Sequence, residues 1–275
     1  MKKVLGIGLL MMLSVCCLFG EANSKKAFLG IHDFVNKPSE NWNLRDGYFF
    51  HIDPINEEYK FIGSFTVKVL LTNSRYDFVC TVKNTPDNMI VELSDMESYN
   101  CDKNGQYIKN SKVIQTSKNV ASQYADQIKT EILSRISKIS DSTVDAEYAK
   151  VVAKPDIFFT ITNSMSELAV KKFVEANING NEVELEVKLG AIDENRHPLT
   201  NELYPLCYKA TGYVPLYKSG FGRFIMLEDQ HLTIYSKNDK LLSAKRGSSY
   251  KVKGKLEVKF IDHSATFWSY SISEE

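Results

Sequence analysis

The sequence predicts an α+β fold, with predominantly antiparallel β-sheet in a sandwich or partly open barrel and one long amphipathic covering helix. Two observations lead to this prediction. Segments that alternate apolar and polar residues, the pattern of half-buried strands, recur in both halves of the chain. Between them lies a long stretch, from Ser117 to about Ile139, whose apolar residues recur every three or four positions as in a helix. A hydrophobic content of 43% supports a sizeable core.

The first 22 residues have the anatomy of a secretory signal peptide. Lys2 and Lys3 form a basic start, residues 4–19 are uncharged, and Gly20 and Ala22 are the small residues of a cleavage site. At 1.5 Å per residue a helix over 4–19 is about 24 Å long, short of the roughly 30 Å hydrocarbon core of a bilayer. We therefore expect an exported protein of the periplasm or cell envelope, or a secreted one, whose mature chain begins at Asn23.

Two cysteines within the apolar run, Cys16 and Cys17, leave a second interpretation, a bacterial lipoprotein anchored through one of them. The lipid-modified cysteine of such proteins follows a small residue, whereas Cys16 follows Val15 and Cys17 follows Cys16. Cleavage after Ala22 fits the small-residue rule better. The sequence contains no Asn-x-Ser/Thr glycosylation site, which suits a bacterial envelope protein.

The first half of the mature chain is expected to hold a loop, several strands and the long helix. Residues 23–46 are polar and mixed, which is typical of a lead-in loop. The strands expected in this half lie at residues 47–52, 65–71, 76–82 and 89–93. A shorter helix is expected from Ser142 to Ala153, because Pro155 would end it.

The second half is predicted to return to β-structure. Residues 173–189 resemble a hairpin, with Asn179-Gly180 at its turn and glutamates alternating with apolar residues after it. Further strands are expected at residues 157–161, 203–208, 223–227, 231–235, 240–244, 250–260 and 266–272. We expect residues 1–22 to be the signal peptide, 23–140 a sheet with the long helix, and 141–275 a β-rich region. The last two are either separate domains or one continuous domain.

The chemistry-bearing residues form no recognisable catalytic, cofactor or metal motif. His51 and Asp53 lie two apart near a strand end and could form a base and its orienting carboxylate, but no nucleophile accompanies them. The remaining histidines stand singly, without the spacing of a zinc site. Net charge is zero, which gives no reason to expect nucleic acid as a partner. We therefore expect no cofactor and no metal.

One aromatic, glycine-flanked segment is the candidate binding site. Its residues are Tyr213, Tyr217, Phe221 and Arg223, in a stretch rich in tyrosine and phenylalanine. Exposed rings at the rim of a sheet could stack on a sugar or anchor a partner protein. The alternative is that these rings belong to the core, as strand aromatics often do. Lys251, Lys253, Lys255 and Lys259 make a basic row on one strand, which is typical of a protected edge strand.

The mature chain holds three cysteines, an odd number. Cys80 and Cys101 are the pair whose disulfide is to be tested, because their segments could be neighbouring strands in an exported protein. The alternative is three buried thiols, Cys207 included, that behave as small hydrophobic groups.

Together these observations favour a non-enzymatic binding or interaction module on a β scaffold in the cell envelope. Its partner would be another envelope protein, a glycan or a small apolar ligand, with membrane contact only through lipidation at Cys16 or Cys17. One alternative is a carrier that holds a small ligand or glycan in a barrel or sandwich cavity. A further alternative is a secreted hydrolase whose site is assembled from dispersed residues.

The signal-peptide interpretation predicts the terminus of the exported protein. N-terminal sequencing and intact mass should give a chain that begins at Asn23 and carries no lipid, because Gly20 and Ala22 form the better processing site. A blocked terminus at Cys16 or Cys17, with the added mass of acyl chains, would contradict the prediction.

Overall fold

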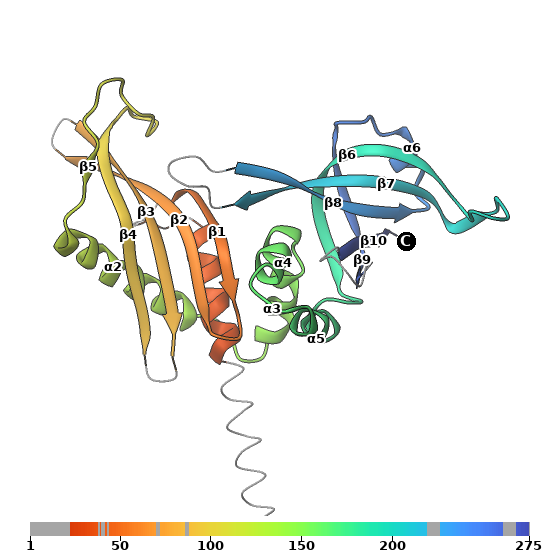
Figure 1. The fold of residues 1–275 in the computed structure, drawn as a ribbon, viewed down its shortest axis with the longest axis horizontal. Coiled ribbons are helices and arrows are strands. Elements are labelled where there is room, and N and C mark those ends of the chain that lie inside the picture. Colours follow the sequence, from red (N-terminus) through yellow and green to blue (C-terminus); the bar gives the residue numbers. More distant parts are fainter. Residues whose placement is uncertain are drawn as a thin grey trace, which may run out of the picture. The chain divides into compact units, whose positions relative to one another are not determined.

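The computed structural model describes residues 23–37, 39, 42, 44–69, 72–85, 88–218, 226–260 and 268–274. The chain divides into two compact units, Met1–Tyr148 and Ala149–Glu275. Both contain antiparallel β-structure together with helices, so the prediction of an α+β chain with dominant antiparallel sheet is confirmed (Figure 1).

The first unit is built on a five-stranded antiparallel sheet in which each strand pairs with the next. Its strands are β1 (Arg45–Asp53), β2 (Glu58–Val69), β3 (Thr72–Asn84), β4 (Met89–Cys101) and β5 (Ile114–Gln115). Phe78, Cys80 and Val82 of β3 are buried, which is the inward face that the alternating sequence predicted. Phe61 and Phe65 of β2 are buried on the same face, and Gly63 between them pairs with Phe78 of β3.

A helix over residues 23–36 replaces the loop expected at residues 23–46. Phe28, Ile31 and Phe34 recur every three residues and are almost completely buried. The two phenylalanine rings meet the inner face of the sheet. Phe28 lies beside Tyr59 (5.7 Å between ring centroids) and Phe34 beside Phe61 (6.1 Å). The helix was missed because polar residues at its start and between its apolar positions gave the segment the composition of a loop, although Leu29 and Val35 are also buried.

Helix α2 (Lys118–Ile136) corresponds to the long helix predicted between Ser117 and Ile139. The Ser117 hydroxyl accepts a hydrogen bond from the backbone N–H of Val120, as an N-cap does. The buried side chains are Ala121, Ala125, Ile128 and Ile132, and Tyr124 packs against Phe65 of β2. Two helices therefore contact this face of the sheet, and the expectation of one covering helix is corrected.

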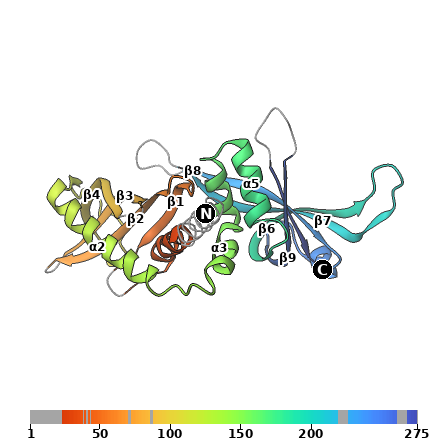
Figure 2. The same ribbon diagram turned by 90° about the horizontal axis from the view of Figure 1, so that it is seen from below.

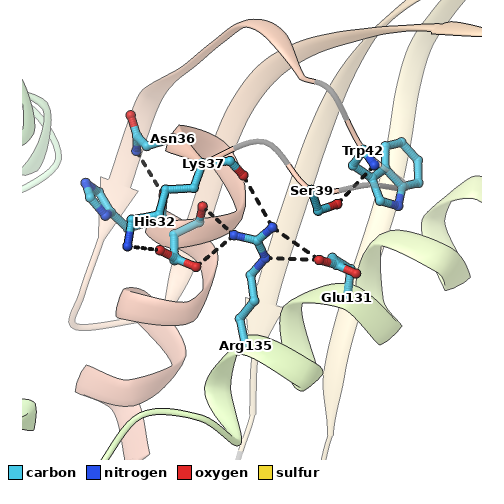
Figure 3. A network of polar contacts seen from close by, with 8 residues as sticks. His32, Asn36, Lys37, Ser39, Trp42, Glu131 and Arg135 are labelled. Carbon is cyan, nitrogen blue, oxygen red and sulfur yellow. Dashed lines mark hydrogen bonds and ion pairs between the residues drawn. The ribbon is translucent and has the colours of Figure 1, made fainter.

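The helix over 23–36 and α2 cross very closely, and polar contacts fix the crossing (Figure 3). Arg135 of α2 donates to the Asp33 carboxylate (2.7 Å), the Asp33 carbonyl (2.8 Å) and the Lys37 carbonyl (3.3 Å). Its guanidinium also contacts Glu131 one turn earlier in α2 (3.1 Å). The Lys37 carbonyl lies past the end of the helix, whereas the Asp33 carbonyl also accepts from the Lys37 backbone N–H (2.9 Å). A cation at this end complements the helix dipole.

The same contacts set the acidity of Asp33. Burial acts to raise the pKa of its carboxyl group, but hydrogen bonds and charge from Lys37 and Arg135 outweigh burial and lower the pKa. The carboxylate therefore stays ionised at neutral pH. It remains a charged partner for Arg135, whose side chain is only 10% exposed.

The second unit begins with three helices, of which the first was expected and the other two replace predicted strands. α3 (Val144–Val152) lies within the helix expected at residues 142–153 and crosses the division between the units. α4 (Pro155–Thr162) replaces the strand expected at 157–161, and α5 (Glu167–Asn177) replaces the first arm of the hairpin expected at 173–189. Pro155 stands in the first turn of α4, and the Ser166 hydroxyl caps α5 by accepting from the backbone N–H of Ala169 (3.4 Å).

The remainder of the second unit is a closed five-stranded barrel. Its elements are β6 (Glu182–Arg196), β7 (Leu203–Lys218), β8 (Met226–Ser236), α6 (Asp239–Ser243), β9 (Ser249–Phe260) and β10 (Trp268–Glu274). Around the barrel the order is β10-β8-β7-β6-β9, and β8 and β10 pair in parallel. This order, with a helix between the third and fourth strands, is the connectivity of an OB-fold. Helix α6 replaces the strand expected at residues 240–244.

Side chains fill the barrel interior. Inward positions of neighbouring strands are occupied by Val187, Ala210, Leu232 and Ile234, all almost completely buried. At Gly212 an added Cβ would lie 2.8 Å from Leu232 and 3.3 Å from Val187, which leaves no room for a larger residue. The interior is therefore a packed core at this level.

The close helix crossing predicts an unusual response to a glycine replacement. In an open helix, Gly→Ala stabilises by roughly 0.5–1 kcal/mol. At Gly30 the added Cβ would lie 2.3 Å from Ile136 Cγ1 and 3.2 Å from the Ile136 backbone nitrogen. Gly30→Ala should therefore lower the free energy of unfolding by about 1–3 kcal/mol, measured by denaturant titration. Gln127→Ala, on the exposed side of α2, should change it little. A stabilised Gly30→Ala protein would contradict this crossing.

Candidate functional site

The candidate site is the outer face of β7 and β8, the second and third strands of the barrel. Side chains alternate between core and surface along both strands. Ala210 and Gly212 of β7 pair with Ile234 and Leu232 of β8 and face inward. The pairs that alternate with these face outward. They are Lys209 with Tyr235, Thr211 with Thr233 and Tyr213 with His231.

Tyr213 is the aromatic centre of this face. Its ring lies edge-on to the His231 ring, with 4.7 Å between the centroids. On the other side, β6 places Lys188 opposite Tyr213 in register. The ring passes over Gly190 of β6, where an added Cβ would lie only 2.5 Å from a ring carbon. Tyr213 therefore lies half-buried along the surface of the barrel.

Two further rows extend the face across the strands. Thr211 and Thr233 are half-buried, and Ser271 of β10 stands beside Thr233 in the parallel register. One step along, Tyr235 is half-buried beside the exposed Lys209. The face thus combines flat rings, hydroxyl groups and cations. Such a combination can stack on a ring, donate and accept hydrogen bonds, and neutralise an anion.

The structure describes one of the four predicted site residues, Tyr213, in full. It places His231 and Lys188, which were not predicted, next to Tyr213. Tyr213 lies on the face as a half-buried ring. The side chain of Tyr217, and Phe221 and Arg223 entirely, lie outside the described residues. Sequence reasoning missed His231 and Lys188 as partners of Tyr213, because strand register is set by non-local pairing. The alternation of β8 could have shown that His231 faces outward with Thr233 and Tyr235. Pairing β8 with β7 as a hairpin would then have placed it near Tyr213.

Of the two alternatives for the cysteines, the structure has Cys80 and Cys101 as free thiols, and strand register keeps them apart. Both cysteines are buried on adjacent strands, but Cys101 pairs with Asn73, seven positions before Cys80 on β3. At about 3.3 Å per residue this separates the two by roughly 23 Å, whereas a disulfide needs Cα atoms within about 7 Å. Burial raises the pKa of the Cys80 thiol, which keeps it protonated and unreactive.

The lysine row of β9 does not protect an edge. β9 pairs with β6 on one side and β10 on the other, so this strand has no open edge. Lys251, Lys253 and Lys255 stand opposite Glu186, Glu184 and Glu182 of β6, respectively. Cross-strand pairs of opposite charge stabilise a sheet. The row is therefore explained by its acidic partners on the next strand.

Other candidate groups have structural roles as well. Asp53 accepts hydrogen bonds from the backbone N–H groups of Ile55 and Asn56 (both 3.0 Å) and from the Asn56 side chain. Both of its carboxylate oxygens thus hold the β1–β2 turn. A hollow of about 390 Å³ lies outside the barrel, and its charged lining mixes Lys150, Lys154 and Lys253 with Glu182 and Glu184. Over the described ranges, no group of three or more His, Cys, Asp and Glu side chains could hold a metal ion.

Comparison with known proteins gives no family for this chain. No protein-family model matches the sequence, and no curated protein matches it significantly. None of the helices in the described part of the chain is long and apolar enough to cross a membrane.

The position of the Tyr213 ring over Gly190 can be tested directly. In Gly190→Ala the added methyl group would occupy the space of the ring edge, so the ring should move away from His231. The cost in stability should be below about 1 kcal/mol, because the end of a flexible side chain can move. We expect the nuclear Overhauser contact between the Tyr213 and His231 rings to disappear in this variant and to persist in Thr211→Ala. Its persistence in Gly190→Ala would contradict the described packing.

Proposed function

We propose that the protein is an exported, non-enzymatic binding module of the cell envelope that contacts a glycan through the outer face of β7 and β8. The observation that carries the proposal is a set of three outward rows on one face. The row Lys188–Tyr213–His231 and the row Lys209–Tyr235 lie on either side of the row Thr211–Thr233. In OB-folds the face of the second and third strands commonly binds oligonucleotides or oligosaccharides. This is an analogy of fold, and the residues of the face must supply the specificity.

The chemistry of the face favours a sugar chain, particularly an acidic one. Tyr213 and Tyr235 offer flat apolar surfaces on which pyranose rings can lie. Thr211 and Thr233 place hydroxyl groups between them, suited to the hydroxyl groups of a sugar. Lys188 is exposed and can pair with a carboxylate or phosphate substituent, whereas the exposed Lys209 stands opposite Asp193 of β6. Successive outward residues lie about 7 Å apart along a strand, so the three rows span about 14 Å, the length of two to three sugar rings.

The proposed cleavage after Ala22 agrees with the contacts of the residues that follow it. Lys25 pairs with Asp145 (3.0 Å) and Lys26 with Asp141 (2.5 Å), so the chain is integrated into the first unit from its third mature residue onward. Cleavage after Ala22 would leave every one of these contacts in place. The packed barrel interior gives less support to the alternative of a carrier with an internal ligand cavity.

The proposal predicts that removal of one ring weakens sugar binding. Calorimetric titration should use carboxylated galacturonic-acid oligomers and neutral N-acetylglucosamine oligomers as probes. We expect the carboxylated oligomers to bind more tightly. Tyr213→Ala should weaken this binding by roughly tenfold or more, about 1.4 kcal/mol, because a stacking surface is lost.

Tyr204→Ala is the matched control for this experiment. Tyr204 is 40% exposed and lies near the start of β7, where its ring packs against His197. Its replacement should leave sugar binding unchanged. Absence of binding by both probes, or an equal loss in the two tyrosine variants, would overturn the assignment of this face to sugar binding.

A further inference from the structure

The segment between β4 and β5, residues 102–113, carries exposed apolar side chains at one end of the sheet in the first unit (Figure 1). Tyr107 is 50% exposed, Ile108 is 46% exposed, and Ile114 at the start of β5 is 54% exposed. Exposed apolar side chains that gather in one patch can mark a contact surface, and these three lie in or directly after one short loop. We call these three residues, with Lys103, Lys109 and Lys112, the basic tip.

Internal contacts hold the basic tip in one conformation. Asp102 accepts from the backbone N–H groups of Asn104 and Gln106 (both 2.8 Å), which closes the turn at Gly105. Arg75 of β3 donates to the Gly105 carbonyl (3.3 Å). The Tyr107 ring packs edge-on against Tyr99 of β4, with 5.4 Å between the centroids. The exposed side chains are thus presented by a pre-formed loop, which lowers the entropic cost of binding.

A second set of hydrogen bonds holds residues 107–111 of the loop. The Ile108 backbone N–H donates to the Asn100 carbonyl (3.3 Å), and the Ser111 hydroxyl donates to the same carbonyl (3.1 Å). The Tyr107 hydroxyl donates to the Ser111 carbonyl. These bonds fix the backbone on both sides of Ile108 while its side chain stays exposed. The loop geometry therefore does not depend on burial of Ile108.

The charge of the basic tip is positive although the whole chain is neutral. Residues 102–113 contain three lysines and one acidic residue, Asp102. Among the residues that the structure describes, none of the three lysines forms an ion pair with an acidic side chain. Strand register places the exposed Lys68 of β2 at the same end, because Lys68 pairs with Asn73, and Asn73 with Cys101. The exposed apolar groups and these cations therefore belong to the same end of the sheet.

We propose that the basic tip docks on the surface of a bilayer that contains anionic phospholipid. Ile108, Ile114 and the Tyr107 ring would enter the headgroup region, and Lys103, Lys109 and Lys112 would contact the phosphates. Apolar side chains ringed by lysines are the combination that peripheral proteins use for this purpose. This surface is separate from the barrel face and does not depend on the glycan proposal.

The test uses the processed, exported protein and vesicles of two compositions. One set is pure phosphatidylcholine, and the other contains about one third phosphatidylglycerol. Co-sedimentation should show stronger binding to the anionic vesicles, and raising the salt to about 0.5 M should abolish most of the difference. One lysine near an anionic surface contributes roughly a fivefold factor, so Lys103→Gln, Lys109→Gln and Lys112→Gln together should weaken binding on the order of a hundredfold.

The apolar contribution has a matched control within the same unit. Ile108→Ser should weaken binding to anionic vesicles by roughly fivefold to tenfold without a change in melting temperature, because its side chain is half exposed. Ile55 is 66% exposed but lies in the β1–β2 turn, at the opposite end of the sheet. Ile55→Ser should leave vesicle binding unchanged.

Three results would overturn the proposal. The first is equal binding to neutral and anionic vesicles, which would point to a lipid anchor instead. The second is an equal loss of vesicle binding in Ile108→Ser and Ile55→Ser. The third is strong binding to soluble dextran sulfate that Ile108→Ser does not affect, accompanied by no vesicle binding. That result would identify a general polyanion site.

Discussion

The close crossing between the helix over residues 23–36 and α2 is the constraint on which the first unit depends. Gly30 lets the two backbones approach, and Arg135 fixes the end of one helix to the side of the other. Together the helices cover the inner face of a sheet whose rings would otherwise meet water (Figure 2). The aromatic core is thus closed by two elements that are about a hundred residues apart in sequence.

Closure of the barrel has a comparable effect in the second unit. Within the closed part of the barrel the strands pair on both sides, so the outward side chains remain to interact with other molecules. The ends of β7 and β8, at residues 214–218 and 226–230, pair with each other. The outer surface is then divided by strand. β6 and β9 balance glutamates against lysines, whereas β7 and β8 carry rings, hydroxyl groups and lysines. The lysines of β9 face glutamates of β6, whereas the rings of Tyr213 and Tyr235 on β7 and β8 remain at the surface.

Both proposed contact surfaces are local features that overall composition does not reveal. The chain has 34 basic and 34 acidic residues, and this balance alone indicates no charged partner. The fold nevertheless collects lysines at one end of the first sheet and groups tyrosines with lysines on the barrel. The two proposed surfaces use different chemistry, one combining lysines with exposed apolar side chains and the other combining rings with hydroxyl groups.

The sequence by itself determined the strands with strict alternation, the long helix and the α+β class, because these patterns are local. It did not determine short apolar segments such as residues 157–161 or 240–244, because their apolar pattern does not distinguish a strand from a helix and their short length favoured the strand. Tertiary structure alone decided which residues meet. Tyr213 reaches His231 and Gly190 through strand register, and the same kind of register keeps Cys80 away from Cys101. Register depends on pairing between distant segments and on barrel closure, which no local window of sequence contains.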